Sequence, residues 1–298
     1  MKSIVIACTA TAALLLPQAA LSVEVVASCG GVYEGAAVLA DDLDCTGHPT
    51  PFIVLTDGAL DLAGHTITAN IFCEKRPSLD QRVGDCVVQG PGTVRGCIDG
   101  YRLQISDVTM SFRAGLCDDG GAEMAAVSAW ASLNLVRSEV SGYPGSGVYG
   151  WAGGTKGTIM KIVDSTIRHV SDRGPAVAAD RLSIVGSTIE GQIVSGRRAQ
   201  LRSSDVTGLG PHYDGVWSYP FSDGSVKLID TTITGMTNTG IRAGNIKLKN
   251  SVVSGSCTAA AADCKDVIAK FGVRALRSSC GTSYCEALGQ SCGVCAND

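Results

Sequence analysis

Apolar and polar residues alternate along this chain in short stretches that end at glycines and small polar residues. In residues 57–70, DGALDLAGHTITAN, the apolar side chains alternate as in a β-strand until Gly64 and His65 interrupt them. Alternation with a period of two is typical of a strand that buries one face. A strand this short is stable only with partners directly beside it. The pattern therefore predicts a fold of many short strands whose neighbours lie directly above and below them.

An eight-residue pattern, apolar-x-apolar-x-x-(Ser/Thr)-x-apolar, recurs through most of the chain. The copies are LQISDVTM at 103, LNLVRSEV at 133, MKIVDSTI at 160, LSIVGSTI at 182, AQLRSSDV at 199, VKLIDTTI at 226 and IKLKNSVV at 246, with looser copies LDLAGHTI at 60 and VVQGPGTV at 87. Each copy reads as a short strand, a polar turn and one more inward residue. A single copy cannot bury its apolar side, whereas stacked copies form continuous aliphatic columns.

A further short strand is expected after the loop that follows each repeat. The segments are RAGLC near 115, SGVYG near 148, GPAVAA near 176, GQIVSG near 193, DGVWS near 216 and TGIRA near 241. Three short parallel strands per turn describe a parallel β-helix. The competing fold is an aliphatic β-sandwich, but a sandwich requires hairpin turns every ~8–12 residues and does not require one phrase to return in each turn.

The LDLAGHTI copy, with the later STI, TTI and SVV endings, resembles the right-handed parallel β-helix superfamily, the pectate-lyase-like proteins, over residues 51–256. The C-terminal stretch CGTSYCEALGQSCGVCAND is similar to the tail of secreted bacterial β-helix proteins of unassigned function. The fold class implied is all-β, a single-stranded right-handed parallel β-helix of about nine to ten turns with a disulfide-rich C-terminal tail. We expect a signal peptide over 1–22, an N-terminal cap over 23–50, the β-helix over 51–256 and a cysteine-rich cap over 257–298.

The N-terminal stretch MKSIVIACTATAALLLPQAALS predicts a cleaved secretory signal, with cleavage after Ser22 or Ala27. A retained membrane helix is the alternative, but Pro17 and Gln18 interrupt a span already shorter than the ~20 apolar residues required. We therefore expect a secreted or periplasmic protein with no membrane attachment after cleavage.

Twelve of the thirteen cysteines follow the expected signal. An even number of cysteines in an oxidising compartment favours disulfides. The predicted pairs are Cys29–Cys45, Cys257–Cys264 and Cys280–Cys295. The alternative is a zinc site formed by Cys280, Cys285, Cys292 and Cys295, because the last two have a C-x-x-C spacing.

Composition and charge narrow the range of partners. Only 17% of the residues are charged and 5% are aromatic, so the core must be aliphatic. The net charge of −4 argues against general nucleic-acid binding, which leaves a strongly basic footprint, but leaves room for a local cationic patch. We expect a monomer without a cofactor. No calcium-binding motif is visible, and calcium stays an open alternative.

A cleft is predicted beside the strand that contains GVYG and its equivalents in the other layers. With Val148, Val177, Val194, Val216 and Ile241 facing inward, the outward side chains include Tyr149, Ala178, Ser195, Trp217 and Arg242. The long turns WAGGTKGT and SYPFSDGS flank the short turns ADR and GRR. Because successive layers are only ~4.8 Å apart, two long loops beside two short turns leave a cleft between them.

The predicted cleft has the residue types that bind acidic sugars. Its floor is Asp180, Arg181, Arg197 and Arg198, its walls are Tyr149, Trp151, Trp217 and Tyr219, Arg242 lies on the same side, and the loop GLGPHYDG adds His212, Tyr213 and Asp214. Aromatic rings stack on sugar rings, and arginines bind carboxylates through two parallel hydrogen bonds. The expected partner is therefore an extracellular polysaccharide.

Two reactions are consistent with this set. For β-elimination from a uronic-acid polymer, Arg197 would neutralise the carboxylate and His212, Tyr219 or a second arginine would remove the neighbouring proton. For hydrolysis, Asp180 and Asp214 would act as acid and base. The arginines favour the lyase.

A third reading is a non-catalytic module that binds glycans, adheres to surfaces or serves as structure. The sequence lacks the polygalacturonase pattern that combines consecutive aspartates with Gly-His-Gly, and it lacks the calcium-binding aspartate set and the Arg-x-Pro-x-x-Arg of pectate lyases. Fold alone does not establish catalysis, so the two classes stay open at this point.

Overall fold

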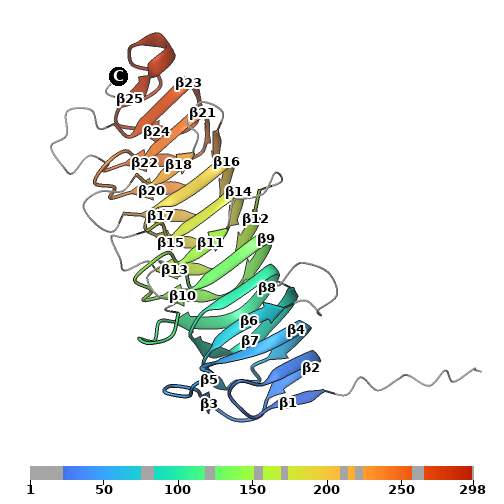
Figure 1. The fold of residues 1–298 in the computed structure, drawn as a ribbon. Coiled ribbons are helices and arrows are strands. Elements are labelled where there is room, and N and C mark those ends of the chain that lie inside the picture. Colours follow the sequence, from blue (N-terminus) through green and yellow to red (C-terminus); the bar gives the residue numbers. More distant parts are fainter. Residues whose placement is uncertain are drawn as a thin grey trace, which may run out of the picture.

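The chain is all-β in the computed structural model, which describes residues 23–74, 84–117, 125–150, 157–168, 174–208, 214–218, 224–256 and 265–296. Within these ranges the one short helix is the 3-10 turn η1 (Glu286–Leu288). Figure 1 shows strands lying across one long axis, from β1 near the blue end to β25 near the red end. No helix in the described ranges is long and apolar enough to span a bilayer. The expected signal, residues 1–22, lies outside the described residues.

The strands form three stacks, defined here by which strand pairs with which. Some strands belong to one stack only. Those confined to the first stack are β6 (Asn70–Glu74), β11 (Val148–Gly150), β18 (Val216–Ser218) and β25 (Ser283–Cys285). Those confined to the second are β1 (Glu24–Val26), β12 (Ile159–Val163) and β19 (Ser225–Ile229). Those confined to the third are β3 (Leu43–Asp44), β5 (Thr66–Thr68), β10 (Glu139–Ser141), β13 (Thr166–Arg168), β15 (Thr188–Glu190), β17 (Asp205–Thr207), β20 (Thr232–Thr234), β22 (Val252–Ser254) and β24 (Ser279–Cys280).

Longer strands run through more than one stack. Those that pass from the first into the second are β2 (Val32–Leu39), β4 (Phe52–Asp61), β9 (Val127–Val136), β14 (Val177–Val185), β16 (Ile193–Arg202), β21 (Ile241–Lys249) and β23 (Val267–Leu276). Strand β7 (Asp85–Arg95) joins the second to the third, and β8 (Ile98–Ser111) contributes to all three.

Every pairing between these strands is parallel, as between β12 and β14 or β14 and β16. A sandwich would require antiparallel hairpins, and the described strands contain none. Parallel pairing also extends past the expected limits of residues 51–256, since β2 pairs with β4 and β23 pairs with β21.

The apolar positions of the repeat form the core. Leu182, Ile184 and Ile189 of one copy are buried, and the register places Ile184 between Ile162 and Leu201 of the neighbouring layers. Equivalent side chains therefore stack in columns, as the sequence pattern predicted. Each fully buried aliphatic side chain contributes roughly 1.5–3 kcal/mol, so the columns are a large part of what stabilises the stack.

The polar turn of the repeat has a left-handed backbone in its fifth position. The residues there are Asp107, Arg137, Asp164, Gly186, Ser203, Asp230, Asn250 and Arg277, with φ between 46° and 61°. Asp and Asn tolerate this conformation better than most side chains do. It turns the chain sharply from the second stack into the third.

The Ser/Thr position of the repeat connects successive layers by hydrogen bonds. The Ser187 hydroxyl donates to the carbonyl oxygen of Val185 at 2.8 Å and accepts the Ser165 backbone N–H at 3.2 Å. The Ser187 backbone N–H in turn donates to the Ser204 hydroxyl at 3.3 Å. Buried hydroxyls at the same position satisfy backbone groups that the turn would otherwise leave unpaired. The repeated Ser/Thr therefore stabilises the turn.

Disulfides lie near both ends of the stack. The predicted Cys29–Cys45 bond is present, as are Cys73–Cys86 and Cys97–Cys117. At the C-terminal end the predicted Cys280–Cys295 bond is present, together with Cys285–Cys292. The predicted Cys257–Cys264 pair lies outside the described residues.

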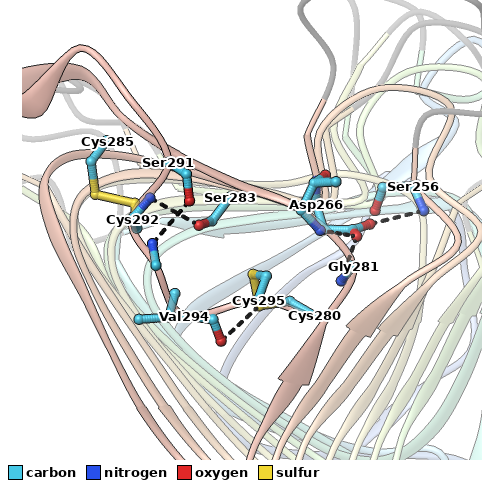
Figure 2. The surroundings of a disulfide bond; sticks show 12 residues. Ser256, Asp266, Cys280, Gly281, Ser283, Cys285, Ser291, Cys292, Val294 and Cys295 are labelled. Atoms are coloured by element: carbon cyan, nitrogen blue, oxygen red, sulfur yellow. Dashed lines mark hydrogen bonds between the residues drawn. A yellow bond between two sulfur atoms is a disulfide. The ribbon is translucent and has the colours of Figure 1, made fainter. Parts of the chain in front are cut away.

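The C-terminal disulfides exclude the zinc alternative, because Cys280, Cys285, Cys292 and Cys295 are all oxidised. Figure 2 shows these bonds beside Asp266, whose carboxylate accepts the backbone N–H groups of Ser256 at 3.2 Å and Gly281 at 2.8 Å. The buried Asp266 side chain thereby holds the last layers together.

Replacing Ser187 with alanine tests the hydroxyl column. The change leaves the buried Ser165 N–H without its acceptor, so we expect the free energy of unfolding to fall by about 1–3 kcal/mol, measured by urea denaturation. The outward-facing Ser183→Ala in β14, the strand before this turn, is the control, and its effect should stay within ~0.5 kcal/mol. Equal losses in both variants would contradict a stabilising role for the column.

Thiol labelling tests the C-terminal disulfides. We expect no alkylation of Cys280, Cys285, Cys292 or Cys295 in denatured, unreduced protein, and full alkylation after reduction, as read by mass spectrometry. Labelling of these four cysteines after treatment with a chelator alone would instead restore the zinc hypothesis.

Candidate functional site

The residues predicted for the cleft walls lie on the outer side of the first stack. The register there aligns Tyr149 with Ala178, Ala178 with Val194, Val194 with Trp217, and Trp217 with Arg242. Tyr149, Trp217 and Arg242 are half-buried, and Ala178 is almost covered. Tyr149 and Trp217 are three layers apart, about 14 Å, and only the small Ala178 and Val194 stand between them.

One predicted strand was placed out of register. The alternating pattern predicts Val194 inside and Ser195 outside, but Ile193 and Ser195 are fully buried and Val194 faces out. The Ser195 hydroxyl donates to the Ser218 hydroxyl at 3.2 Å. Both Ile193 and Val194 fit an apolar position, and a slip by one residue exchanges the two faces of a strand.

Trp130 is a third aromatic side chain on this edge, and the sequence analysis missed it. It follows the first-stack part of β9, it is 42% exposed, and its Nε1 donates to the Asp99 carboxylate at 3.1 Å. Ser128, two residues before Trp130 in the same strand, pairs with Tyr149 of the next layer. The signal in the sequence was an aromatic residue three positions before the LNLVRSEV repeat.

Asp180 is buried, although it was predicted to line the cleft floor. Its side chain is 8% exposed, with Oδ1 3.5 Å from Nε of Arg197 and Oδ2 3.9 Å from Nε of Arg181. The register of β14 and β16 shifts at this point. A bulge bends the chain here from the first stack into the second and turns the carboxylate inward.

The surroundings of Asp180 fit a structural role. A Cβ at Gly157 or Gly196 would collide with its carboxylate, so both glycines allow the close approach. The Arg197 side chain is 56% exposed, but its guanidinium is already paired with Asp180. Less of its charge is therefore available to neutralise a substrate carboxylate.

Asp214 is also paired. Its Oδ1 accepts the Thr239 backbone N–H at 3.1 Å, and its Oδ2 lies 3.6 Å from Nε of Arg242. Burial raises the pKa of the Asp214 carboxyl above its ordinary value, while Arg242 and the Thr239 hydrogen bond oppose that shift. A buried carboxyl with a raised pKa is a feature of catalytic acids. In the predicted hydrolase site, however, Asp214 could act as an acid only if Asp180 faced the same substrate as the base.

Asp180 and Asp214 do not face one another. Val177, Ile193 and Val216 share one column, and Asp180 lies three residues after that column whereas Asp214 lies two residues before it. Five positions along a strand correspond to roughly 16 Å, in addition to the ~10 Å between their layers. An inverting pair requires about 6.5–9.5 Å, so these two carboxylates do not form the predicted hydrolase site. His212, Trp151, Tyr213 and Tyr219 lie outside the described residues.

The outer side of the second stack carries a basic face, which the sequence analysis did not identify. Six successive strands each have three outward positions there, and these positions hold eight cations and no Asp or Glu. We define the basic face as Lys161, Arg181, Arg198, Arg202, Lys227, Lys247, Lys249 and Arg274. The predicted Arg181 and Arg198 belong to it and are directly paired in register. The signal in the sequence was the lysine at the second position of MKI, VKL and IKL.

The N-terminal half of the same outer side is hollowed and differently charged. A cavity of about 590 Å³ there is lined by Asp57, Asp85, Arg102, Gln104 and Asn134, and it ends at Ile159. Arg102 pairs with Asp85 at 3.5 Å, and Asn134 Oδ1 is buried without a hydrogen-bond partner. None of the predicted site residues lines this hollow.

A metal site is not formed within the described ranges, where no three His, Cys, Asp or Glu side chains converge. The described residues therefore offer no ligand set for calcium.

The pH dependence of stability tests whether the pKa of the Asp214 carboxyl is raised in the folded protein. A carboxyl whose pKa is higher in the folded than in the unfolded chain favours folding at low pH, and this contribution is lost as pH rises through the folded pKa. Compared with Asp214→Asn, which keeps an acceptor for Thr239, the native protein should therefore lose stability as pH rises from about 3 to about 7. Urea denaturation across that range measures the difference; a change of opposite sign would mean that Arg242 dominates.

Comparisons with known proteins find no match. No protein-family model matches the chain, and neither a curated protein nor a solved structure does. The all-β structure is compatible with a β-helix fold, and membership in the pectate-lyase-like superfamily stays a prediction.

Proposed function

We propose that this chain is an exported, single-stranded right-handed parallel β-helix of about nine to ten turns that binds extracellular polysaccharide without cleaving it. The fold proposal is supported by the three parallel stacks and by the left-handed turn that recurs in eight successive layers from Asp107 to Arg277. Export is supported by five disulfides in the described chain, because such bonds persist in oxidising compartments.

The observation that carries the binding proposal is the row of aromatic side chains on the first stack. Trp130 is exposed and its ring is fixed by the Asp99 hydrogen bond. Tyr149 lies in the next layer and Trp217 three layers further, with small side chains between. Rigid aromatic rings spaced along a shallow surface suit the stacking of successive sugar rings.

Binding is favoured over cleavage because the described residues lack a complete catalytic set. Asp180 is buried under two arginines, and Asp214 is paired with Arg242. The lyase reading would assign Arg197 to the substrate carboxylate, but Asp180 competes for it. The candidate bases His212 and Tyr219 lie outside the described residues. The experiment must therefore measure cleavage of the polysaccharide as well as binding.

Replacing Trp130 or Trp217 with alanine should weaken binding to polysaccharide about tenfold, because each change removes an aromatic stacking surface. Titrations of polygalacturonate, alginate, xylan and dextran, followed by intrinsic tryptophan fluorescence or calorimetry, would identify a ligand and measure the loss. Phe271→Ala is the matched control, since Phe271 is 52% exposed at the far C-terminal end.

The same polysaccharides are incubated with the protein and examined for new reducing ends and for the ultraviolet absorbance of unsaturated products. The proposal predicts neither. Turnover that Arg197→Ala abolishes would establish the lyase instead, and unchanged affinity in both tryptophan variants would reject the aromatic site.

A further inference from the structure

The basic face of the second stack is separate from the aromatic row of the first stack. Its eight cations occupy six consecutive layers, and the outward positions between them are apolar, small or amide side chains. Like charges concentrated on one flat surface repel one another. A protein whose net charge is −4 does not need such a surface for solubility.

Most of these cations lack an internal counterion. Within the described residues, Lys161, Arg202, Lys227, Lys247 and Arg274 form no ion pair, and Arg198 donates to the neutral Gln200 amide at 3.2 Å. Elsewhere in the described chain, Arg137 pairs with Asp107 and Arg168 pairs with Glu139 and Glu190, whereas cations such as Arg95 and Arg113 form no ion pair there but do not line up in successive layers of one face. The basic face is therefore the part of the described surface where positive charge is concentrated and uncompensated.

The spacing of the cations suits a linear ligand. Consecutive layers are ~4.8 Å apart, so Lys227 and Lys247, which are paired in register, present two charges at that interval. Arg181 and Arg198 repeat the arrangement two layers away. The rows run along the long axis of the stack, and strands hold their side chains in fixed positions.

We propose that the basic face is a second binding site, which holds a linear acidic polysaccharide along the axis of the stack. The ligand carries carboxylate or sulfate groups at intervals of a few ångströms, and successive anions contact Lys227, Lys247 and the arginines beside them. Arginine and lysine are the side chains that bind such groups. A ligand of the basic face must be negatively charged, and its binding there does not depend on the aromatic row.

A polysaccharide is favoured over a single-stranded nucleic acid by the side chains of the basic face itself. No aromatic side chain on the described basic face is placed to stack on bases, as single-stranded nucleic acid requires. Nucleic-acid binding is therefore an outcome of the test that would overturn the proposal.

The test compares full-length exported protein with Lys227→Glu/Lys247→Glu. The probes are fluorescent polygalacturonate, dextran sulfate, neutral dextran and single-stranded DNA, with affinity measured by anisotropy at low and physiological salt. We expect the native protein to bind the two acidic polysaccharides, to bind them more weakly as salt rises, and to ignore neutral dextran. The double variant should bind at least tenfold more weakly.

The matched control is Arg95→Glu/Arg113→Glu, which reverses two exposed charges away from the basic face and gives the same net charge. Its affinity should equal that of the native protein, and circular dichroism should show that both variants remain folded. Equal losses in the two variants, no binding of either acidic polymer at low salt, or tighter binding of DNA would each overturn the proposal.

The failures of the two proposals are distinguishable. Trp217→Ala should leave salt-dependent binding at the basic face unchanged, while Lys227→Glu/Lys247→Glu should leave salt-independent binding at the aromatic row unchanged. Loss of salt-dependent binding in Trp217→Ala would show a single shared site and would contradict a separate basic face.

Discussion

Each layer of this protein depends on the next layer for its backbone hydrogen bonds. The strands are too short to be stable alone: β13 and β15 have three residues each. Their N–H and C=O groups are satisfied only by strands directly above and below, as the register of Thr166, Thr188 and Asp205 shows. This requirement forces equivalent residues into columns. The buried hydroxyls, the left-handed turns and the outward charges all follow the same register because the backbone does.

The part of the fold that this constraint governs could be predicted from the sequence. Inward apolar positions and the turn at the polar pair return in each copy. The columns can therefore be predicted from one amino-acid sequence alone. The prediction failed at Val194, because adjacent Ile193 and Val194 are equally apolar and the turn before them sets the register. It also failed at Asp180, where a bulge that the pattern does not encode turns an apparently exterior carboxylate inward.

The site was harder to predict than the fold for a related reason. The eight-residue phrase is defined by its apolar and Ser/Thr positions, and the residues at its variable positions differ from copy to copy. The lysines of MKI, VKL and IKL lie there, and only the register shows that they share one surface. Similarly, Trp130 was visible in the sequence, but its exposure and its bond to Asp99 depend on where the chain leaves the first stack. Functional side chains occupy the positions that the stacking requirement leaves unrestricted.

Charge segregation along the axis explains how an acidic protein can present a basic surface. Residues 23–50 contain five acidic residues and no lysine or arginine, whereas the basic face begins in the middle of the stack. The register from Asp85 through Arg102, Ser132, Ile159, Arg181 and Arg198 to Ser225 spans six layer steps, about 29 Å at ~4.8 Å per step. The Debye length is about 8 Å at physiological ionic strength. The acidic layers are therefore screened from Lys227, and an anion near that lysine experiences the local cations rather than the net charge of the chain.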